Sequence, residues 1–114
     1  MLNIIPPKSA LFFLLLISCT SNAGSSGEHD IKMMFGSDII MFGTSTPPAD
    51  TCSHHGRHFK FDATTESGKN LLSILLAAKL ANKKIDIWYK ESTAPGKVGC
   101  NSNEVSEVIN IGIR

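Results

Sequence analysis

Aromatic residues and cysteines are scarce in this sequence, and neither sign of charge is in excess. The chain has 114 residues with one Trp, one Tyr, six Phe and three Cys, and its formal net charge is +1. Lys8 is the only charged residue before Ala23, so ten basic and ten acidic residues follow it. Because phosphate backbones are bound by clustered Lys and Arg, we expect no nucleic acid partner. The length allows one domain.

Motifs of catalysis are also lacking. The sequence contains no Gly-x-Ser-x-Gly turn of the kind that presents a nucleophilic serine. Residues 96–99 (GKVG) precede no helical pattern, so they predict a turn and not a phosphate-binding loop. Glu104 and Glu107 flank the last predicted strand, where carboxylates are typical of a solvated rim. We therefore expect a protein that is not an enzyme and has no cofactor.

No apolar run is long enough to cross a bilayer as a helix. The longest unbroken run covers residues 11–17 (LFFLLLI) and follows the single positive charge of Lys8. A short apolar core behind a positive charge is typical of a signal peptide. We therefore expect an exported protein.

Two processing sites fit this signal. Residues 16–19 (LISC) resemble a bacterial lipobox, which would remove residues 1–18 and lipidate Cys19. Residues 21–23 (SNA) would instead allow cleavage after Ala23. We favour the first, which predicts a lipoprotein of the periplasm or outer membrane; the second predicts a freely secreted protein. A polar Gly/Ser tether then extends to about residue 29, and residues 30–114 form the domain.

Cysteine pairing is the next expectation. A domain of this size buries only about 60–65% of the surface of its unfolded chain, so a disulfide would add needed stability. With Cys19 lipidated or removed, Cys52 and Cys100 remain as a pair in an oxidising compartment. We predict a disulfide between them, which would contribute about 4 kcal/mol in the chain-entropy model.

One helix dominates the middle of the sequence. Apolar residues recur at helical spacing from residue 66 onward, with Thr64 or Thr65 as the N-cap and Asn82 as the left-handed stop. One face consists of Leu71, Ile74, Leu75, Ala78 and Ala81, and a second row consists of Leu72, Leu76 and Leu80. This wide arc predicts that both sides are covered, one by a sheet and the other by a partner subunit. The favoured alternative is a helix that closes one end of a small barrel.

Five strands are predicted around this helix. Residues 30–35 and 38–43 form a hairpin, residues 58–62 a third strand, and residues 85–90 a fourth strand with Ile85, Ile87 and Tyr89 on one face. In the last strand we expect Ile109, Ile111 and Ile113 to point inward. The order strand, strand, strand, helix, strand, strand is that of the OB-fold, a five-stranded barrel. A generic α+β sandwich is the alternative.

The segment from Cys52 to Cys100 also carries a resemblance. It combines the first cysteine, the aromatic strand HFKFD, the run GKNLLSILLAAKLANKKIDIWY and the second cysteine. This pattern resembles small exported bacterial OB-fold proteins, among them the B subunits of subtilase-cytotoxin and pertussis-type toxins. It is more closely similar to uncharacterised secreted single-domain proteins. The resemblance implies an OB barrel, ring-forming oligomers and glycan binding.

Few residues suggest a binding site. His54, His55 and His58 lie within one short segment, and imidazoles at such spacing could bind zinc or copper, although a solvated loop beside a disulfide is the favoured interpretation. Trp88 points away from the core-facing row of its strand, where it could stack on a sugar, lie in a subunit interface or pack under the following loop. Lys60 lies on the outer face of the third strand.

These observations lead to three hypotheses for function. The first is a non-enzymatic exported binding module that recognises a glycan, peptide or protein of the cell envelope, with Trp88 and Lys60 as ligand-binding candidates. The second is an envelope protein that assembles through its apolar helix, as toxin B subunits do. The third is a small periplasmic metal binder that uses His54, His55 and His58.

Overall fold

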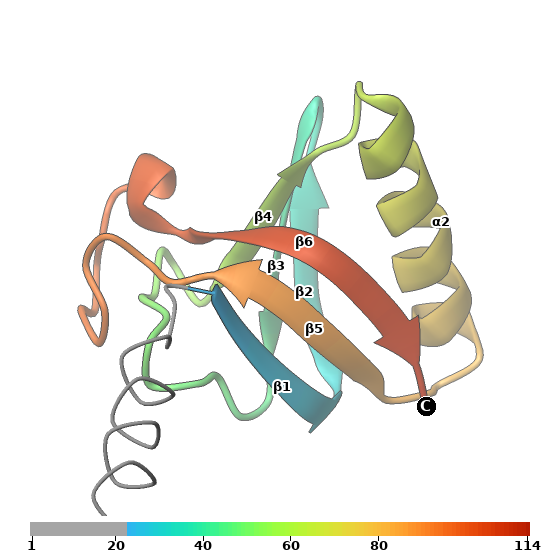
Figure 1. Ribbon diagram of the computed structural model, residues 1–114, viewed down its shortest axis with the longest axis horizontal. Coiled ribbons are helices and arrows are strands. Elements are labelled where there is room, and N and C mark those ends of the chain that lie inside the picture. The colour runs from blue at the N-terminus through green and yellow to red at the C-terminus, as the bar shows by residue number, and fades with distance from the viewer. Residues whose placement is uncertain (1–22) are drawn as a thin grey trace, which may run out of the picture.

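The protein is a β-rich domain built from one sheet and one helix (Figure 1). The computed structural model describes residues 23–114, so the predicted cleavage and lipidation at Cys19 lie outside the described residues. The elements in chain order are β1 Ala23–His29, β2 Ile31–Gly36, β3 Ile39–Thr44, β4 Phe59–Asp62, α2 Glu66–Leu80, β5 Ile85–Lys90, the 3-10 turn η1 Ser102–Glu104, and β6 Ser106–Ile113. Within this part of the chain, no helix is long and apolar enough to cross a membrane.

The sheet has six strands in the order β1-β5-β6-β4-β3-β2. Neighbouring strands are antiparallel except β4 and β6, which pair in parallel over Phe59↔Ser106 and Lys60↔Glu107. β1 and β2 lie at opposite ends of this order although only Asp30 separates them in the chain. The strand pairing therefore leaves the sheet open between β1 and β2.

The predicted tether is wrong for its last residues. Ala23–His29 forms β1, which pairs with β5 from Ala23↔Lys90 to His29↔Ile85 with a bulge before His29. This pairing uses backbone groups, so a Gly/Ser-rich sequence can join the sheet without an apolar face of its own. The sheet consequently has six strands where the sequence predicted five.

The helix and its caps confirm the prediction from spacing. Thr65 is the N-cap, and its side chain accepts a hydrogen bond from the Gly68 amide at 2.9 Å. Asn82 has a φ of 55°, the left-handed conformation that ends a helix. Leu71, Leu75 and Ala78 are buried against the sheet.

Much of the second apolar row of the helix is not covered by the chain itself. Leu72 is half-buried, whereas Leu76 is 42% exposed and Leu80 is 87% exposed, so cover of this side by a partner subunit stays a prediction. In Figure 1 the helix stands at one side of the sheet, and it packs on β6 and β4. Only the face toward these strands can be buried by the chain itself.

The predicted side-chain orientation in the last strand, β6, is also partly wrong. Ile111 is buried as predicted, but Ile109 and Ile113 are 51% and 47% exposed, and Val108 is buried instead. The register explains the difference at Ile109 and Val108, because Trp88 lies opposite Asn110 while Tyr89 lies opposite Val108; Ile113 is the last residue of β6. Ile109 is therefore the extra residue of a β-bulge, and a bulge shifts the alternation of side chains by one.

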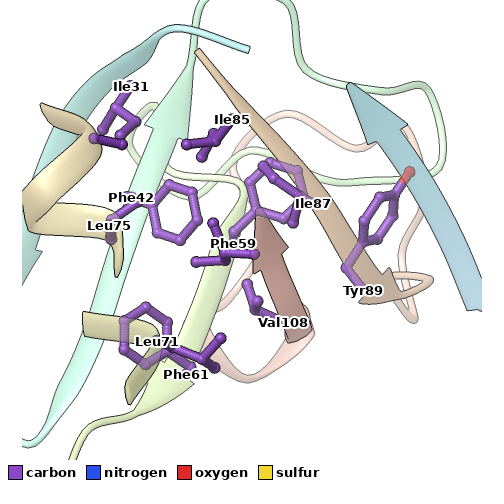
Figure 2. Close-up of a cluster of buried hydrophobic side chains, with 12 residues drawn as sticks. Ile31, Phe42, Phe59, Phe61, Leu71, Leu75, Ile85, Ile87, Tyr89 and Val108 are labelled. Carbon is purple, nitrogen blue, oxygen red and sulfur yellow. The ribbon is translucent and has the colours of Figure 1, made fainter. Parts of the chain in front are cut away.

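The core lies between the curved sheet and the helix (Figure 2). Phe59 is central to it, with ring centroids 5.4 Å from Phe42 and 5.2 Å from Tyr89. The fully buried members include Phe42, Phe59, Leu75, Ile85, Ile87 and Tyr89. Burying one such side chain contributes about 1.5–3 kcal/mol, so this cluster is the main source of stability.

The Cys52–Cys100 disulfide is confirmed, with Cα atoms 6.2 Å apart. It lies in a second, smaller cluster of buried residues, Met41, Cys52, Cys100 and Val105. The bond therefore ties the loop before β4 to the loop before β6, at the end of the sheet away from most of the helix contacts.

Candidate functional site

A row of four residues crosses the sheet, with the buried Met41 at one end followed by three charged residues. Met41 on β3 lies opposite Lys60 on β4, and Lys60 lies opposite Glu107 on β6. Lys90 on β5 continues the row, because its Nζ is 3.5 Å from Glu107 Oε1. We call Met41, Lys60, Glu107 and Lys90 the transverse row. Three of its four members carry charges, in the order positive, negative, positive from β4 to β5.

A groove opens beside one end of this row. Its volume is about 440 Å³, and it runs along β3 and β4 to the η1 turn. Ile39, which is 43% exposed, supplies most of the aliphatic surface, whereas Met41 lines the groove but is 7% exposed. The lining residues are Ile39, Met41, Lys60, Phe61, Asp62, Ser102, Asn103 and Glu107. The groove thus combines aliphatic surface with an ammonium, an amide and two carboxylates.

A second cleft of about 160 Å³ continues the groove toward β5. The two share Lys60, Asn103 and Glu107, and the second adds Lys90 and Thr93 among its walls. Because they share three lining residues, the groove and the cleft are direct neighbours on the sheet.

Hydrogen bonds fix the rim of the groove. Lys60 Nζ donates to the Ser102 carbonyl at 3.2 Å, which ties β4 to η1. In η1 the Asn101 amide donates to Glu104 Oε1 at 2.8 Å, and the Ser92 hydroxyl donates to the Glu104 carbonyl at 2.6 Å. The groove wall is therefore held by hydrogen bonds within the loop between β5 and β6 and by one from β4, as a preorganised binding surface requires.

One carboxylate of the groove, that of Asp62, is stabilised in its ionised form. The hydroxyl and backbone amide of Thr64 both donate to Asp62 Oδ1, and these hydrogen bonds lower the pKa of Asp62 below its usual value. Asp62 Oδ1 is occupied by these donors, whereas its side chain is exposed at the groove. A ligand hydroxyl or amide could therefore donate to this carboxylate.

Trp88 lies two residues before Lys90 on β5, and both side chains point to the same exposed side of the strand. Its side chain is 43% exposed, and the strand partner opposite it is Asn110 on β6. The indole edge reaches to within 3.7 Å of the position that a Cβ on Gly112 would occupy. The ring therefore leans over β6, where Gly112 leaves room for it, and half of its surface remains open to solvent.

Two of the three candidate metal ligands are brought together, because the rings of His54 and His55 lie edge to face with centroids 4.6 Å apart, but the three do not form a metal site. His54 is held by a 2.7 Å hydrogen bond between its Nδ1 and the Cys100 carbonyl, and His55 is exposed. His58 is half-buried, and burial lowers its pKa. Between residues 23 and 114, no group of three His, Cys, Asp or Glu side chains has a geometry that could hold a metal ion.

Sequence reasoning found Lys60 and Trp88 but missed most of the groove. Ile39, Asn103 and Glu107 come from three segments, so only the strand order brings them beside Lys60. The alternation of β4 was the one usable signal, because it placed Lys60 outward between two buried phenylalanines. Comparisons with protein-family models, curated proteins and solved structures find no match for this chain.

Proposed function

We propose that this protein is a non-enzymatic binding module of the bacterial cell envelope that holds a saccharide in the groove beside Lys60. The observation that carries this proposal is the groove itself, with its preorganised rim and its mixture of aliphatic and polar lining residues. Ligand sites in proteins are typically concave, with a few polar groups that fix orientation. Carboxylates, amides and ammonium groups are suited to the hydroxyls of a sugar, which both donate and accept hydrogen bonds.

The strand order supports assignment of the domain to the OB-fold. β1 and β2 would be the two halves of one bent strand, so that the sheet becomes a partly open five-stranded barrel. β3 and β4 would then be its second and third strands, which form the face that binds oligonucleotides and oligosaccharides in OB-folds. The groove lies on this face. The balanced charge after Ala23 favours the saccharide over a nucleic acid.

Export is part of this proposal. The apolar run at residues 11–17 and the disulfide both fit an oxidising compartment outside the cytoplasm. Lipidation at Cys19 would anchor the domain to a membrane and keep the groove close to the cell surface. Mass spectrometry of the mature N-terminus tests the anchor, which is wrong if the chain begins at an unmodified Gly24.

A glycan array followed by calorimetric titration tests the saccharide proposal. We expect Glu107→Gln and Lys60→Met each to weaken binding of the strongest array ligand about tenfold, because each change removes a charged hydrogen-bonding group from the groove. Lys69→Met is the matched control, because Lys69 is exposed on the helix and lies outside the groove. An array without any bound glycan, or equal affinities of the three variants, would contradict the proposal.

Self-assembly is a second candidate function, supported by the uncovered stripe on α2. Leu76 and Leu80 lie one turn apart on the helix, and Leu80 is almost fully exposed. A second copy of the chain could bury these side chains, as the resemblance to toxin B subunits suggests. Light scattering should then show an oligomer for the unchanged protein and a monomer for Leu80→Glu. A monomer at high protein concentration without the substitution would reject this candidate.

A further inference from the structure

We propose that the uncovered side of α2 docks on the surface of an anionic lipid bilayer, with Leu76 and Leu80 in the interface and lysines beside them. This inference goes beyond the saccharide proposal and does not depend on it, because neither leucine lines the groove or the neighbouring cleft. It is drawn from the exposure of the two leucines, the charges around them and the way in which the helix ends.

The first step is the position of the apolar side chains. Leu72, Leu76 and Leu80 follow one another at intervals of four residues, so they lie on one side of the helix. The side with Leu71 and Leu75 faces the core. Exposure rises along the row, because Leu72 is half-buried, Leu76 is 42% exposed and Leu80 is 87% exposed. In Figure 1 no other described element lies beyond the helix, so this apolar surface faces solvent.

The second step is the charge around these leucines. From Glu66 to Lys84 the chain carries four lysines and one carboxylate, that of Glu66, which lies at the opposite end of the helix from Leu80. Asp30 pairs with Lys84 at 3.1 Å, and the other three lysines form no ion pair with any described residue. All four are exposed: Lys69, Lys79, Lys83 and Lys84. The surroundings of the exposed leucines are therefore basic, although the whole protein is nearly neutral.

The third step is the fixed end of the helix. The Lys83 amide donates to the Ala78 carbonyl at 2.9 Å. The Asn82 amide donates to the Lys79 carbonyl at 3.2 Å, which completes the pair of bonds typical of a helix that ends in a left-handed residue. Lys79 Nζ also donates to the Ile31 carbonyl on β2 at 3.0 Å. The basic and apolar side chains at this end are thus presented by an ordered backbone.

The fourth step is the choice of an anionic bilayer as the partner. A helix with exposed leucines on one side and lysines at its borders is typical of segments that lie in the interface of a membrane. Lysine side chains can extend their aliphatic stems along such a surface and place their ammonium groups among the phosphates. Each lysine near an anionic surface adds to the attraction, whereas a neutral bilayer gains only from the leucines.

A second copy of the chain fits this side of the helix less well. If two copies packed antiparallel with Leu76 at the two-fold axis, Leu72 of each would meet Leu80 of the other. The same axis would place Lys69 of each copy opposite Lys83 of the other. Like charges placed opposite each other disfavour such a contact. The lysines therefore favour the lipid surface over self-association through α2.

Two leucines and a few lysines give weak and reversible membrane binding by themselves. Stable attachment usually needs two signals, for example one lipid chain and one basic patch. If Cys19 carries the lipid proposed above, the helix supplies the second signal. The domain would then lie on the membrane with α2 against the headgroups.

The test is co-sedimentation of the exported, disulfide-bonded protein with lipid vesicles, in the variant Cys19→Ser so that no lipid chain contributes. We expect binding to phosphatidylcholine vesicles that contain about a quarter phosphatidylglycerol at low salt. Binding to pure phosphatidylcholine, or to the anionic vesicles in about 0.5 M salt, should be about tenfold weaker, because salt screens the lysines.

Matched substitutions locate the surface. Leu80→Ser and Lys83→Gln should each weaken binding to the anionic vesicles about fivefold. Val98→Ser and Lys97→Gln are the controls and should have no effect. Val98 is 87% exposed, like Leu80, and Lys97 is an exposed lysine in the same distant loop.

Each remaining outcome would overturn the inference. Equal binding to neutral and anionic vesicles would exclude the role of the lysines, and equal losses in the control variants would exclude this side of α2. No binding to vesicles, together with an oligomer that Leu80→Ser dissociates in light scattering, would assign the surface to a second copy. No binding and no oligomer would leave α2 without a partner. The glycan array tests the saccharide proposal separately in every case.

Discussion

At the scale of single residues, two histidines make stability depend on pH. His29 lies at the corner between β1 and β2, is 3% exposed, and has its ring centroid 6.5 Å from that of Phe59. Burial lowers the pKa of His29, partly offset by the nearby charge of Asp86, and burial also lowers the pKa of His58. Both side chains are therefore neutral in the folded protein at a pH where the unfolded chain already binds protons.

We predict that the histidines make the free energy of unfolding fall as the pH drops below their ordinary pKa of about 6.5. The sign follows because the unfolded state binds the extra protons. His29→Phe should flatten this decline, and His55→Phe, at an exposed position, should not. Denaturant melts at pH 5 and pH 7.5 measure the effect; equal stabilities at both pH values in the unchanged protein would contradict it.

Gly68 shows how a single residue sets the junction of α2 with β4. A Cβ at Gly68 would lie 1.7 Å from the Asp62 carbonyl oxygen, whereas a Cβ at Gly112 would meet Trp88 at an ordinary 3.7 Å. We expect Gly68→Ala to destabilise the protein by about 1–3 kcal/mol, because the end of β4 must move. Gly112→Ala should change stability by less than about 0.5 kcal/mol. Thermal melts of the pair check this, and equal losses would refute the explanation.

At the scale of elements, prediction from sequence succeeded where the apolar residues kept a regular helical or alternating spacing along the whole element. The spacing from Leu71 to Ala78 predicted the helix, and the alternation of Ile85, Ile87 and Tyr89 predicted the facing of β5. It failed for β6, because a bulge at Ile109 has no signature in the residue types. It failed for β1, because that strand is held by backbone pairing with β5 and has a polar, glycine-rich sequence.

The candidate site was less predictable than the elements for a related reason. Lys60 could be found from the alternation of its own strand. Its partners Asn103 and Glu107 could not, because the parallel pairing of β4 with β6 joins segments more than 40 residues apart. The residue pattern of one strand does not show which distant loop will line a groove beside it.

At the scale of the whole molecule, the disulfide joins the two loops that border the sheet. Cys52 and Cys100 are separated by 48 positions, so the bond restricts a large part of the unfolded chain. We predict that the double variant Cys52→Ala with Cys100→Ala loses about 2–5 kcal/mol of stability. Urea unfolding of the double variant and of the unchanged protein measures this difference. As a control, reductant should lower the stability of the unchanged protein and leave that of the double variant the same. A double variant as stable as the oxidised protein would contradict the prediction.

The central claim is that the outer face of β3, β4, β6 and β5 is a saccharide-binding surface. The most direct measurement is an NMR titration of the ¹⁵N-labelled, disulfide-bonded protein with the saccharide that binds most strongly on the glycan array. We predict the largest shifts at the amides of Lys60, Asn103 and Glu107, which line both the groove and the adjoining cleft. Shifts confined to the helix or to the segment from His54 to His58 would contradict the claim.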